Sequence, residues 1–258
     1  DSDETTGQTS ISQTLINNSE IPQTLVYTVT PTSGDVGACV GDPFTVTITV
    51  NPVPLIPNQT AVICSDESFT VTLLNNPPTT ILPTGTTYVW TVVDNINVDG
   101  DLPATTPQTT ISQTLTNLTN EVQFVIYTVT PTSGTDGICV GDDFTVTVEV
   151  DPKPSIEDVD FGAICSNDDF SVTPTDGGGF TNTDIVPADT TYTWTVFDAN
   201  GFITGDTDET TGLTSIGQTL INTSNETQTV VYTVTPTSGV QGFCEGLSFT
   251  ISVDVDPR

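Results

Sequence analysis

An eight-residue block that occurs three times is the feature that most restricts how this chain can fold. The block, Tyr-Thr-Val-Thr-Pro-Thr-Ser-Gly, begins at Tyr27, Tyr127 and Tyr232, so successive copies start 100 and 105 residues apart. Residues 1–50 also align without a gap onto residues 206–255. A period near 100 residues is the size of one sandwich domain and is too long for the coils of a solenoid. The sequence therefore predicts a tandem array of similar domains.

Proline-rich segments mark the boundaries of the repeats. They read Asn51-Pro52-Val53-Pro54 and Asp151-Pro152-Lys153-Pro154, and the last copy ends at Asp256-Pro257. Alternating proline favours an extended, semi-rigid spacer. We therefore predict the C-terminal half of a repeat at 1–50, cut from a longer array, and full repeats at 51–150 and 151–258. Because such spacers leave little slack, the repeats should stack end to end as a rod.

Period-two alternation of apolar and polar residues indicates strands. From Phe144 to Val150 the apolar side chains fall on one face and Thr or Glu on the other. Similar strands with Gly and Pro turns between them predict an all-β, two-sheet sandwich for each repeat of about 100 residues. Trp90 and Trp194 alternate in phase with valines, which favours a place in the core. The competing interpretation is an exposed platform that stacks on sugar rings.

The charge balance excludes several classes of function. Lys and Arg together number 2, Asp and Glu 33, and His is absent, for a formal net charge of −31. Nucleic-acid binding and attraction to an anionic membrane both need cationic side chains. Catalytic pairs and zinc sites built on His are impossible. No acidic residue lies in an apolar run that would raise its pKa for glycosidase chemistry. We therefore predict that the chain is not an enzyme.

The remaining composition predicts an exported protein. There is no run of 18 apolar residues, so no transmembrane helix is expected. The chain begins in polar sequence, as expected for a mature or excised piece. Five cysteines, no methionine and very few cationic residues suit an extracytoplasmic location.

The five cysteines fall into two groups by their place in the repeat. Three precede the Phe of a final strand by five residues, and two precede a Phe near the start of a full repeat by five: Cys39, Cys139 and Cys244, and then Cys64 and Cys165. One possible pairing joins sequence neighbours, Cys39–Cys64 and Cys139–Cys165. The other closes each full repeat on itself, Cys64–Cys139 and Cys165–Cys244, and leaves Cys39 with a partner outside the segment. We favour the second pairing, because first and last strands of such sandwiches run parallel and equal offsets would place both sulfurs at one end.

Two loops after the Trp strands concentrate oxygen-bearing side chains. Their candidate metal ligands are Asn95, Asn97, Asp99, Asp101, Asp198, Asp206 and Asp208. The segment from Asn95 to Gly100 resembles the front of a calcium loop, although position twelve would be Thr106 instead of Glu. These oxygen-rich loops are candidates for a Ca²⁺ or Mg²⁺ site of another geometry. The interpretation that we favour is a solvated acidic turn.

Several motifs resemble the PKD-like and Ig-like repeats of Bacteroidota cell-surface adhesins. They are the Tyr-Thr-Val-Thr-Pro block, the pattern Cys-x-Gly-x-x-Phe-Thr-Val-Thr from Cys39 and Cys139, and the closing Asn/Asp-Pro-x-Pro. The Trp strand resembles the PKD signature, but the Gly-Asp-Gly turn that follows it there is replaced here. The resemblance implies PKD-like or Ig-like sandwiches, secretion, display at the outer surface of a bacterium, and a part in adhesion or gliding motility.

Two functions follow from these observations. The first is a non-catalytic stalk in a large surface adhesin, whose partners are neighbouring repeats of the same chain. The second is an accessory carbohydrate-binding region of a secreted polysaccharide-degrading enzyme, with surface polysaccharide as the partner. Exposed, coplanar aromatic side chains would favour the second function, and aromatic side chains in phase with the core favour the first.

Overall fold

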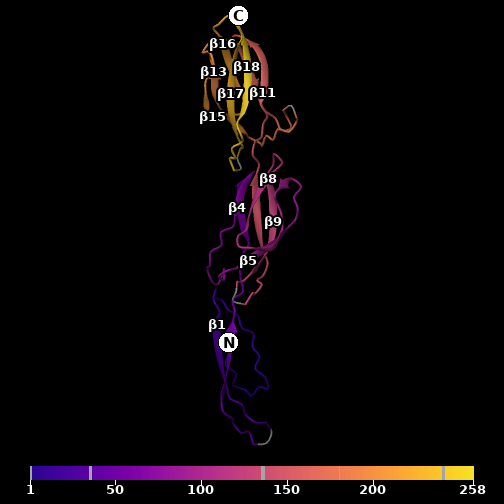
Figure 1. Cartoon of the computed structure of the whole chain (residues 1–258), viewed down its shortest axis with the longest axis vertical. Coiled ribbons are helices and arrows are strands. Elements are labelled where there is room, and N and C mark those ends of the chain that lie inside the picture. Colours follow the sequence, from indigo (N-terminus) through magenta and orange to yellow (C-terminus); the bar gives the residue numbers. More distant parts are fainter. Residues whose placement is uncertain (1, 35–36, 135–136, 180, 240–241) are drawn as a thin grey trace.

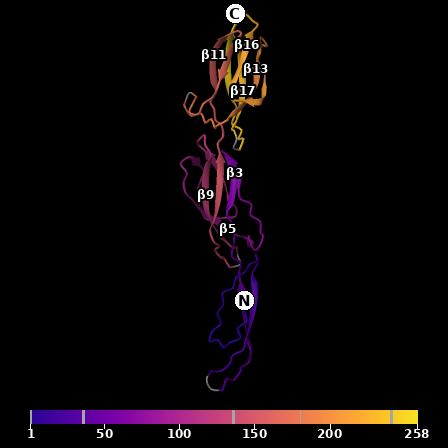
Figure 2. The same cartoon turned by 180° about the vertical axis from the view of Figure 1, so that it is seen from behind.

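The computed structural model describes residues 2–34, 37–134, 137–179, 181–239 and 242–258. Every regular element within these residues is a β-strand. The strands form three units that follow one another end to end along a single axis, with the third unit at the top of the view (Figure 1) and the same order seen from behind (Figure 2). The predicted rod is therefore confirmed. None of the described residues forms a helix long and apolar enough to cross a membrane.

The first unit, residues 1–50, is a two-stranded antiparallel sheet preceded by chain without regular structure. Strand β1 (Gln23–Val29) pairs with β2 (Phe44–Val50), and Val29 lies opposite Phe44. No second sheet covers this hairpin within the described residues.

The second unit, residues 51–150, is a sandwich of two sheets. The larger sheet has the order β3-β10-β9-β5-β7, and the smaller one has the order β4-β8-β6. The strands are β3 (Gln59–Cys64), β4 (Glu67–Thr70), β5 (Thr87–Val92), β6 (Val98–Asp99), β7 (Ala104–Gln108), β8 (Ser112–Asn117), β9 (Gln123–Thr132) and β10 (Phe144–Asp151).

The third unit, residues 151–258, repeats this arrangement strand for strand. Its sheets have the orders β11-β18-β17-β13-β15 and β12-β16-β14. The strands are β11 (Val159–Cys165), β12 (Asp168–Val172), β13 (Thr191–Asp198), β14 (Ile203–Thr204), β15 (Glu209–Leu213), β16 (Ile216–Asn222), β17 (Gln228–Thr237) and β18 (Phe249–Asp256).

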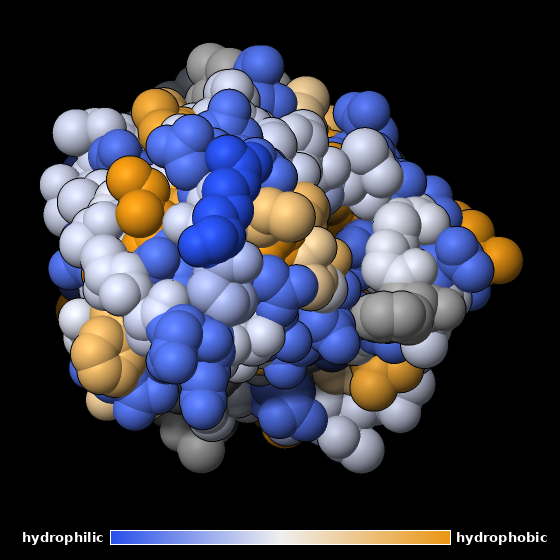
Figure 3. Space-filling model, turned by 90° about the horizontal axis from the view of Figure 1, so that it is seen from above, coloured by the Kyte–Doolittle hydropathy of each residue, from blue (hydrophilic) through white to orange (hydrophobic). Residues whose placement is uncertain are grey.

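Each sandwich has its own core, built from the apolar faces that the alternation predicts. The buried residues of the second unit come from both of its sheets, and those of the third unit do the same. Trp90 and Trp194 are 6% and 3% exposed, and their indole N–H groups donate to the carbonyls of Leu102 and Thr207 at 3.0 Å. The prediction that both tryptophans fill the core is confirmed. Viewed along the rod from above, the remaining apolar residues show as small separate groups among hydrophilic ones (Figure 3).

The first and last strands of each sandwich run parallel and side by side. Strand β3 pairs with β10, and Cys64 lies opposite Asp151 at the end where the chain leaves the unit. Strand β11 pairs with β18 in the same way, and Cys165 lies opposite Asp256. This parallel pairing decides where the cysteines lie.

Candidate functional site: the junction between repeats

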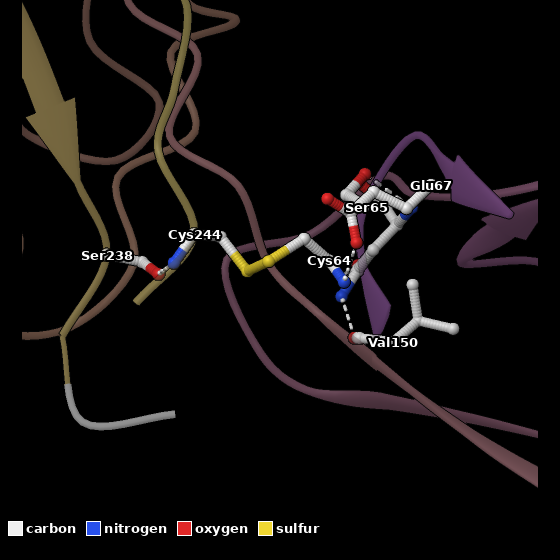
Figure 4. Close-up of a disulfide and its surroundings, with 7 residues drawn as sticks. Cys64, Ser65, Glu67, Val150, Ser238 and Cys244 are labelled. Atoms are coloured by element: carbon white, nitrogen blue, oxygen red, sulfur yellow. Dashed lines mark hydrogen bonds between the residues drawn. A yellow bond between two sulfur atoms is a disulfide. The ribbon is translucent and has the colours of Figure 1, made fainter. Parts of the chain in front are cut away.

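A disulfide joins the second unit to the third. Cys64 and Cys244 are 180 residues apart in sequence, and their Cα atoms lie 5.7 Å apart, within the usual range for a bridged pair. Figure 4 shows Cys64 at the end of a strand of the second unit and Cys244 in a loop of the third. The bridge therefore crosses the boundary between two repeats, beside the proline linker.

Neither pairing expected from the sequence is formed. Cys64–Cys139 and Cys165–Cys244 were predicted within repeats, and Cys39–Cys64 and Cys139–Cys165 between sequence neighbours. The structure instead pairs Cys64 with Cys244 and leaves Cys39, Cys139 and Cys165 as free thiols. Cys64 and Cys244 each form a disulfide, as predicted, but the predicted partner of each was wrong.

The error has a geometric cause. Phe69, used as the reference for Cys64, lies in β4, whereas Cys64 ends the preceding strand β3. The chain turns between them at Ser65 and Asp66, and Asp66 has a φ of +68°, a conformation that Asp and Asn tolerate. Cys139 precedes the beginning of β10, and Cys64 lies opposite its end. Over the length of such a strand, at about 3.3 Å per residue, roughly 25 Å separates the two ends.

We call Cys64 and Cys165 the first-strand cysteines, because each ends the first strand of its unit. A buried network fixes the position of Cys64. The backbone N–H of Ser65 donates to the carbonyl of Asp151 at 2.9 Å, and the Ser65 hydroxyl accepts a hydrogen bond from the N–H of Asn117 at 2.9 Å. The side-chain amide of Asn117 donates to the carbonyl of Val150 at 2.9 Å. The end of β3 is therefore tied to the end of β10.

We call Cys39, Cys139 and Cys244 the loop cysteines, because each lies in the loop before the final strand of its unit. The backbone N–H of Cys244 donates to the Ser238 hydroxyl at 2.8 Å, and the N–H of Ser238 donates to the carbonyl of Cys244 at 2.9 Å. Ser238 is the serine of the repeated Thr-Ser-Gly, so the third copy of the block that defines the repeat shapes the loop that presents Cys244 (Figure 4).

The loop of Cys244 also contacts the end of the second unit directly. Gly242 has a φ of +78°, and a Cβ on it would lie 2.4 Å from the carboxylate of Asp151. Only glycine combines this conformation with so close an approach. Gly246 similarly leaves room for the carbonyl of Pro154, which a Cβ would meet at 2.3 Å. The linker and the loop are therefore packed against each other, and Pro152 and Pro154 are buried.

Asp151 places a carboxyl group inside this junction. Asp151 is 1% exposed, and its side-chain Oδ1 accepts no hydrogen bond from any described residue. Burial, and then the negative charge of Glu149, raise the pKa of Asp151 above its ordinary value. The equivalent residue between the first and second units is Asn51, which lies against Gly137 as Asp151 lies against Gly242.

The predicted metal ligands of the second unit instead bond to their own loop and to the neighbouring strand β9. The carboxylate of Asp101 accepts a hydrogen bond from the backbone N–H of Asn95 at 2.8 Å. The side-chain Oδ1 of Asn95 accepts one from the backbone N–H of Asn97 at 3.1 Å. The Asn95 amide donates to the carbonyl of Phe124 at 3.2 Å. Asp99 is exposed on β6. These contacts close the turn with its own polar groups.

In the third unit, Asp198, Asp206 and Asp208 lie closer together, but they too are engaged by the backbone. Burial on its own raises the pKa of Asp198, but backbone N–H groups of the following turn, led by that of Ile203, donate to it and hold its pKa below the ordinary value. Burial and the charges of Asp198 and Asp208 raise the pKa of Asp206. Asp208 accepts the N–H of Val196 at 2.8 Å.

Within the described part of the chain, no group of three or more Asp, Glu, Cys or His side chains is placed to hold a metal ion. The interpretation as acidic turns agrees better with the contacts of both loops.

Two residues that support the ends of the complete repeats, Asn117 at the junction and Asn222 at the far end of the third unit, were not among the predicted site residues. Asn117 and Asn222 lie in Asn-x-Thr/Ser sequences that occur often by chance in a Thr-rich chain, yet both side chains are buried and support the final strand of their units. The serine of the Thr-Ser-Gly block was used only as a repeat marker. These asparagines and serines recur at the period of the repeat, and this recurrence could have identified them from the sequence.

Fold and junction together define a rod of tandem β-sandwich repeats with a covalent link between neighbours. The chain belongs to the PKD-like domain family, whose model matches residues 2–54, 61–154 and 162–258. The match agrees with the PKD-like part of the resemblance found in the sequence motifs. Comparison with curated proteins finds no significant match.

Several solved structures of multidomain fragments match the chain over most of its length. The FN1-FN3 domains of chicken CNTN1 are 11% identical with a TM-score of 0.33, covering 90% of this chain and 76% of that one. An I-band fragment of titin is 8% identical with a TM-score of 0.30, covering 85% and 72%. Zebrafish RET cadherin-like domains are 11% identical with a TM-score of 0.23, covering 93% and 58%. These likenesses concern the fold alone.

Proposed function

We propose that the chain is a non-catalytic stalk segment of a large secreted adhesin at the surface of a bacterial cell, serving attachment or gliding motility. The observation that carries this proposal is the bridge between Cys64 and Cys244 across the junction of two stacked repeats. The sequence motifs, which resemble those of Bacteroidota gliding adhesins such as SprB, support the cellular setting.

The position of the bridge suits a part that transmits tension. A pull on the two ends of the chain enters the second unit along residues 51–64, crosses the disulfide, and leaves the third unit along residues 244–258. Cys64 and Cys244 are separated by 180 positions, so 179 residues lie between them. These residues lie outside the covalent route. Unfolding both sandwiches would release none of that length, which amounts to about 600 Å of extended chain at roughly 3.5 Å per residue.

The aromatic side chains give less support to a carbohydrate-binding region. Trp90 and Trp194, the residues best suited to stack on sugar rings, are buried. Among the described residues of the two complete repeats, the exposed aromatic residues are single phenylalanines at separate positions of the repeat: Phe124, Phe161, Phe197, Phe202 and Phe243. A spacer therefore agrees better with the distribution of aromatic surface.

Two properties support display outside the cell. Disulfides persist in oxidising, extracytoplasmic surroundings, and this chain has one at its junction. A net charge of −31 also keeps an extended surface soluble and disfavours association with like chains.

Single-molecule stretching between the two chain ends tests the stalk. The oxidised chain should lengthen only by the parts outside the loop of residues 65–243, and reduction or Cys64→Ser should add about 600 Å of extension. A fully oxidised chain that extends as far as the reduced one would refute the mechanical role. Antibody labelling of intact cells of the source organism tests the location, and labelling that requires permeabilised cells would contradict it.

A further inference from the structure

Three cysteines have no partner in the structure, although each lies where a partnered cysteine lies in another unit. Cys39 and Cys165 are exposed, and Cys139 is half-buried. The inference drawn from them rests on the proposed function as a stalk segment, and it concerns what covers these thiols in an array of repeats.

Cys165 is held by the same three hydrogen bonds of its neighbours as Cys64, the other first-strand cysteine. The N–H of Ser166 donates to the carbonyl of Asp256 at 2.9 Å, as that of Ser65 does to Asp151. The hydroxyl of Ser166 accepts the N–H of Asn222 at 3.0 Å, and the amide of Asn222 donates to the carbonyl of Val255 at 2.7 Å. Cys165 is therefore held at the end of the third unit as Cys64 is held at the end of the second.

The loop cysteines of the first two units have the surroundings of Cys244. The N–H of Cys139 donates to the Ser133 hydroxyl at 2.8 Å, and the N–H of Cys39 donates to the Ser33 hydroxyl at 2.9 Å. The residue before each loop cysteine has a positive φ, +49° at Ile138 and +48° at Phe243. Gly137 meets Asn51 at the end of the first unit, as Gly242 meets Asp151. The junction before the second unit therefore has the geometry of the bridged junction.

We propose that Cys39, Cys139 and Cys165 are halves of further inter-repeat disulfides. The first-strand cysteine of every repeat pairs with the loop cysteine of the repeat that follows it. The partner of Cys165 is then the loop cysteine of a following copy of this repeat. Cys39 and Cys139 each pair with the first-strand cysteine of a preceding copy.

The bond forms by thiol–disulfide exchange with an oxidised disulfide of the exporting compartment. The thiolate of Cys165 attacks that disulfide, forms a mixed disulfide and releases one thiol. The incoming loop cysteine then attacks the Cys165 sulfur and releases the second thiol. Two protein thiols are oxidised to one disulfide, one external disulfide is reduced to two thiols, and the two protons remain with those thiols.

Bridges at every junction give the rod two covalent routes. One route rises through the first strand of a repeat, crosses a bridge, and continues through the final strand of the next repeat. The second route uses the final strand of the former and the first strand of the latter. Because these two strands are parallel neighbours, β3 beside β10 and β11 beside β18, the routes run side by side through each sandwich. If the chain were cut once in either route, the other route would still hold the rod together.

The first test extends the full chain after Pro257 by a second copy of residues 153–258, since Asp256-Pro257 corresponds to Asp151-Pro152. The chain is oxidised in a mixture of reduced and oxidised glutathione. Non-reducing peptide mapping should show a Cys165–Cys244 bridge beside the Cys64–Cys244 bridge. Cys165→Ser in the original copy should abolish the new bridge, and the same change in the added copy should leave it intact.

The second test places residues 153–205 before residue 1, because residues 1–50 correspond to 206–255 and complete that repeat. The added Cys165 should then form a bridge to Cys139, and alkylation of Cys139 by iodoacetamide should be lost. In the unextended chain Cys39, Cys139 and Cys165 should all be alkylated, whereas Cys64 and Cys244 should not.

The Cys64–Cys244 bridge serves as an internal standard for folding in both extended chains. The proposal is overturned if this bridge forms while Cys165 in the first extended chain, or Cys139 in the second, stays reactive. It is also overturned if Cys139 or Cys165 is protected in the unextended chain. Either result would leave the stretching behaviour of the unextended chain untouched, so failure of this proposal is distinguishable from failure of the stalk function.

Discussion

The first unit and the two complete repeats have similar sequences in their last two strands but bury these strands very differently. In all three the hairpin has the same register, with Val29 opposite Phe44, Val129 opposite Phe144, and Val234 opposite Phe249. Phe44 is nevertheless 48% exposed, whereas Phe144 and Phe249 are each 2% exposed. Strand pairing therefore follows from the local alternation of residues, and burial requires the second sheet that the front half of a repeat supplies.

The conformation of the loop that presents a cysteine, like the strand pairing, follows from local sequence. In the first unit the Ser33 hydroxyl holds the N–H of Cys39 at 2.9 Å, although no sandwich surrounds it. The side-chain amide of Asn17 likewise donates to the carbonyl of Val50 at 2.8 Å, as Asn117 does to that of Val150. The comparison shows that the cysteine loop does not depend on the core, whereas the stability of each strand does.

Removing the strand phenylalanine should give the largest difference between the units. Phe144→Ala is expected to destabilise the second unit by about 3–5 kcal/mol, because it leaves a cavity in a closed core. Phe44→Ala should cost well under about 1 kcal/mol, because its ring already contacts water. Thermal unfolding followed by tryptophan fluorescence measures the first effect, and amide exchange in β1 and β2 measures the second. Equal costs would mean that the first unit is covered in solution.

Removing the strand-supporting asparagine should give the next largest difference. Asn117→Ala leaves the buried carbonyl of Val150 and the part-buried carbonyl of Glu121 without their donor, which should cost about 1–3 kcal/mol. Asn17→Ala should cost less, because water can reach the carbonyls of Val50 and Ile21. Urea unfolding of both variants gives the comparison. A larger loss for Asn17→Ala would contradict it.

The two junctions differ in the residue that follows the final strand sequence, Asn51 or Asp151, and Asp151→Asn makes them alike at this position. The pKa of Asp151 is raised in the folded state. Its contribution to the stability of the fold is therefore most favourable while the carboxyl is protonated, and this contribution is lost as the pH rises through the folded-state pKa. The variant should therefore melt at a higher temperature than the natural chain at pH 7, with the difference shrinking toward pH 3. The gain should be on the order of 1 kcal/mol, the scale of one unpaired buried acceptor.

Melting curves of both chains from pH 3 to pH 8 measure this effect, with Asn51→Asp as the reciprocal change. That change should lower stability at pH 7, if the first junction is packed like the second. A melting temperature that falls in Asp151→Asn would show that a neighbour of the carboxylate donates to it.

Calcium should have the smallest effect of the changes considered. Because the acidic turns are closed by their own backbone N–H groups, CaCl₂ and NaCl of matched ionic strength should raise the melting temperature equally by screening. The control is Asp101→Ala, which should leave the calcium response unchanged. A calcium-specific increase that disappears in this variant would restore the metal site.

The sequence by itself determined the repeat, the all-β class and the inward faces of the strands. Each of these rests on a pattern that is complete within a few residues, such as the alternation from Phe144 to Val150 or the phase of Trp90 with its neighbours. The turn after Cys64 was also legible in principle, since Ser65-Asp66 and Ser166-Asn167 occupy the same place in successive repeats and Asp66 and Asn167 have positive φ values.

Only the tertiary structure decided which cysteines meet. Equal spacing from Phe69 and from Phe144 could not reveal that Cys64 and Cys139 lie at opposite ends of a parallel strand pair, because one turn separates Cys64 from its reference residue. The partner of Cys64 lies 180 residues away, and it is brought close by the stacking of one sandwich on another. Contacts between units leave no local periodicity in a sequence, so a bond that links two repeats becomes visible only when both are placed.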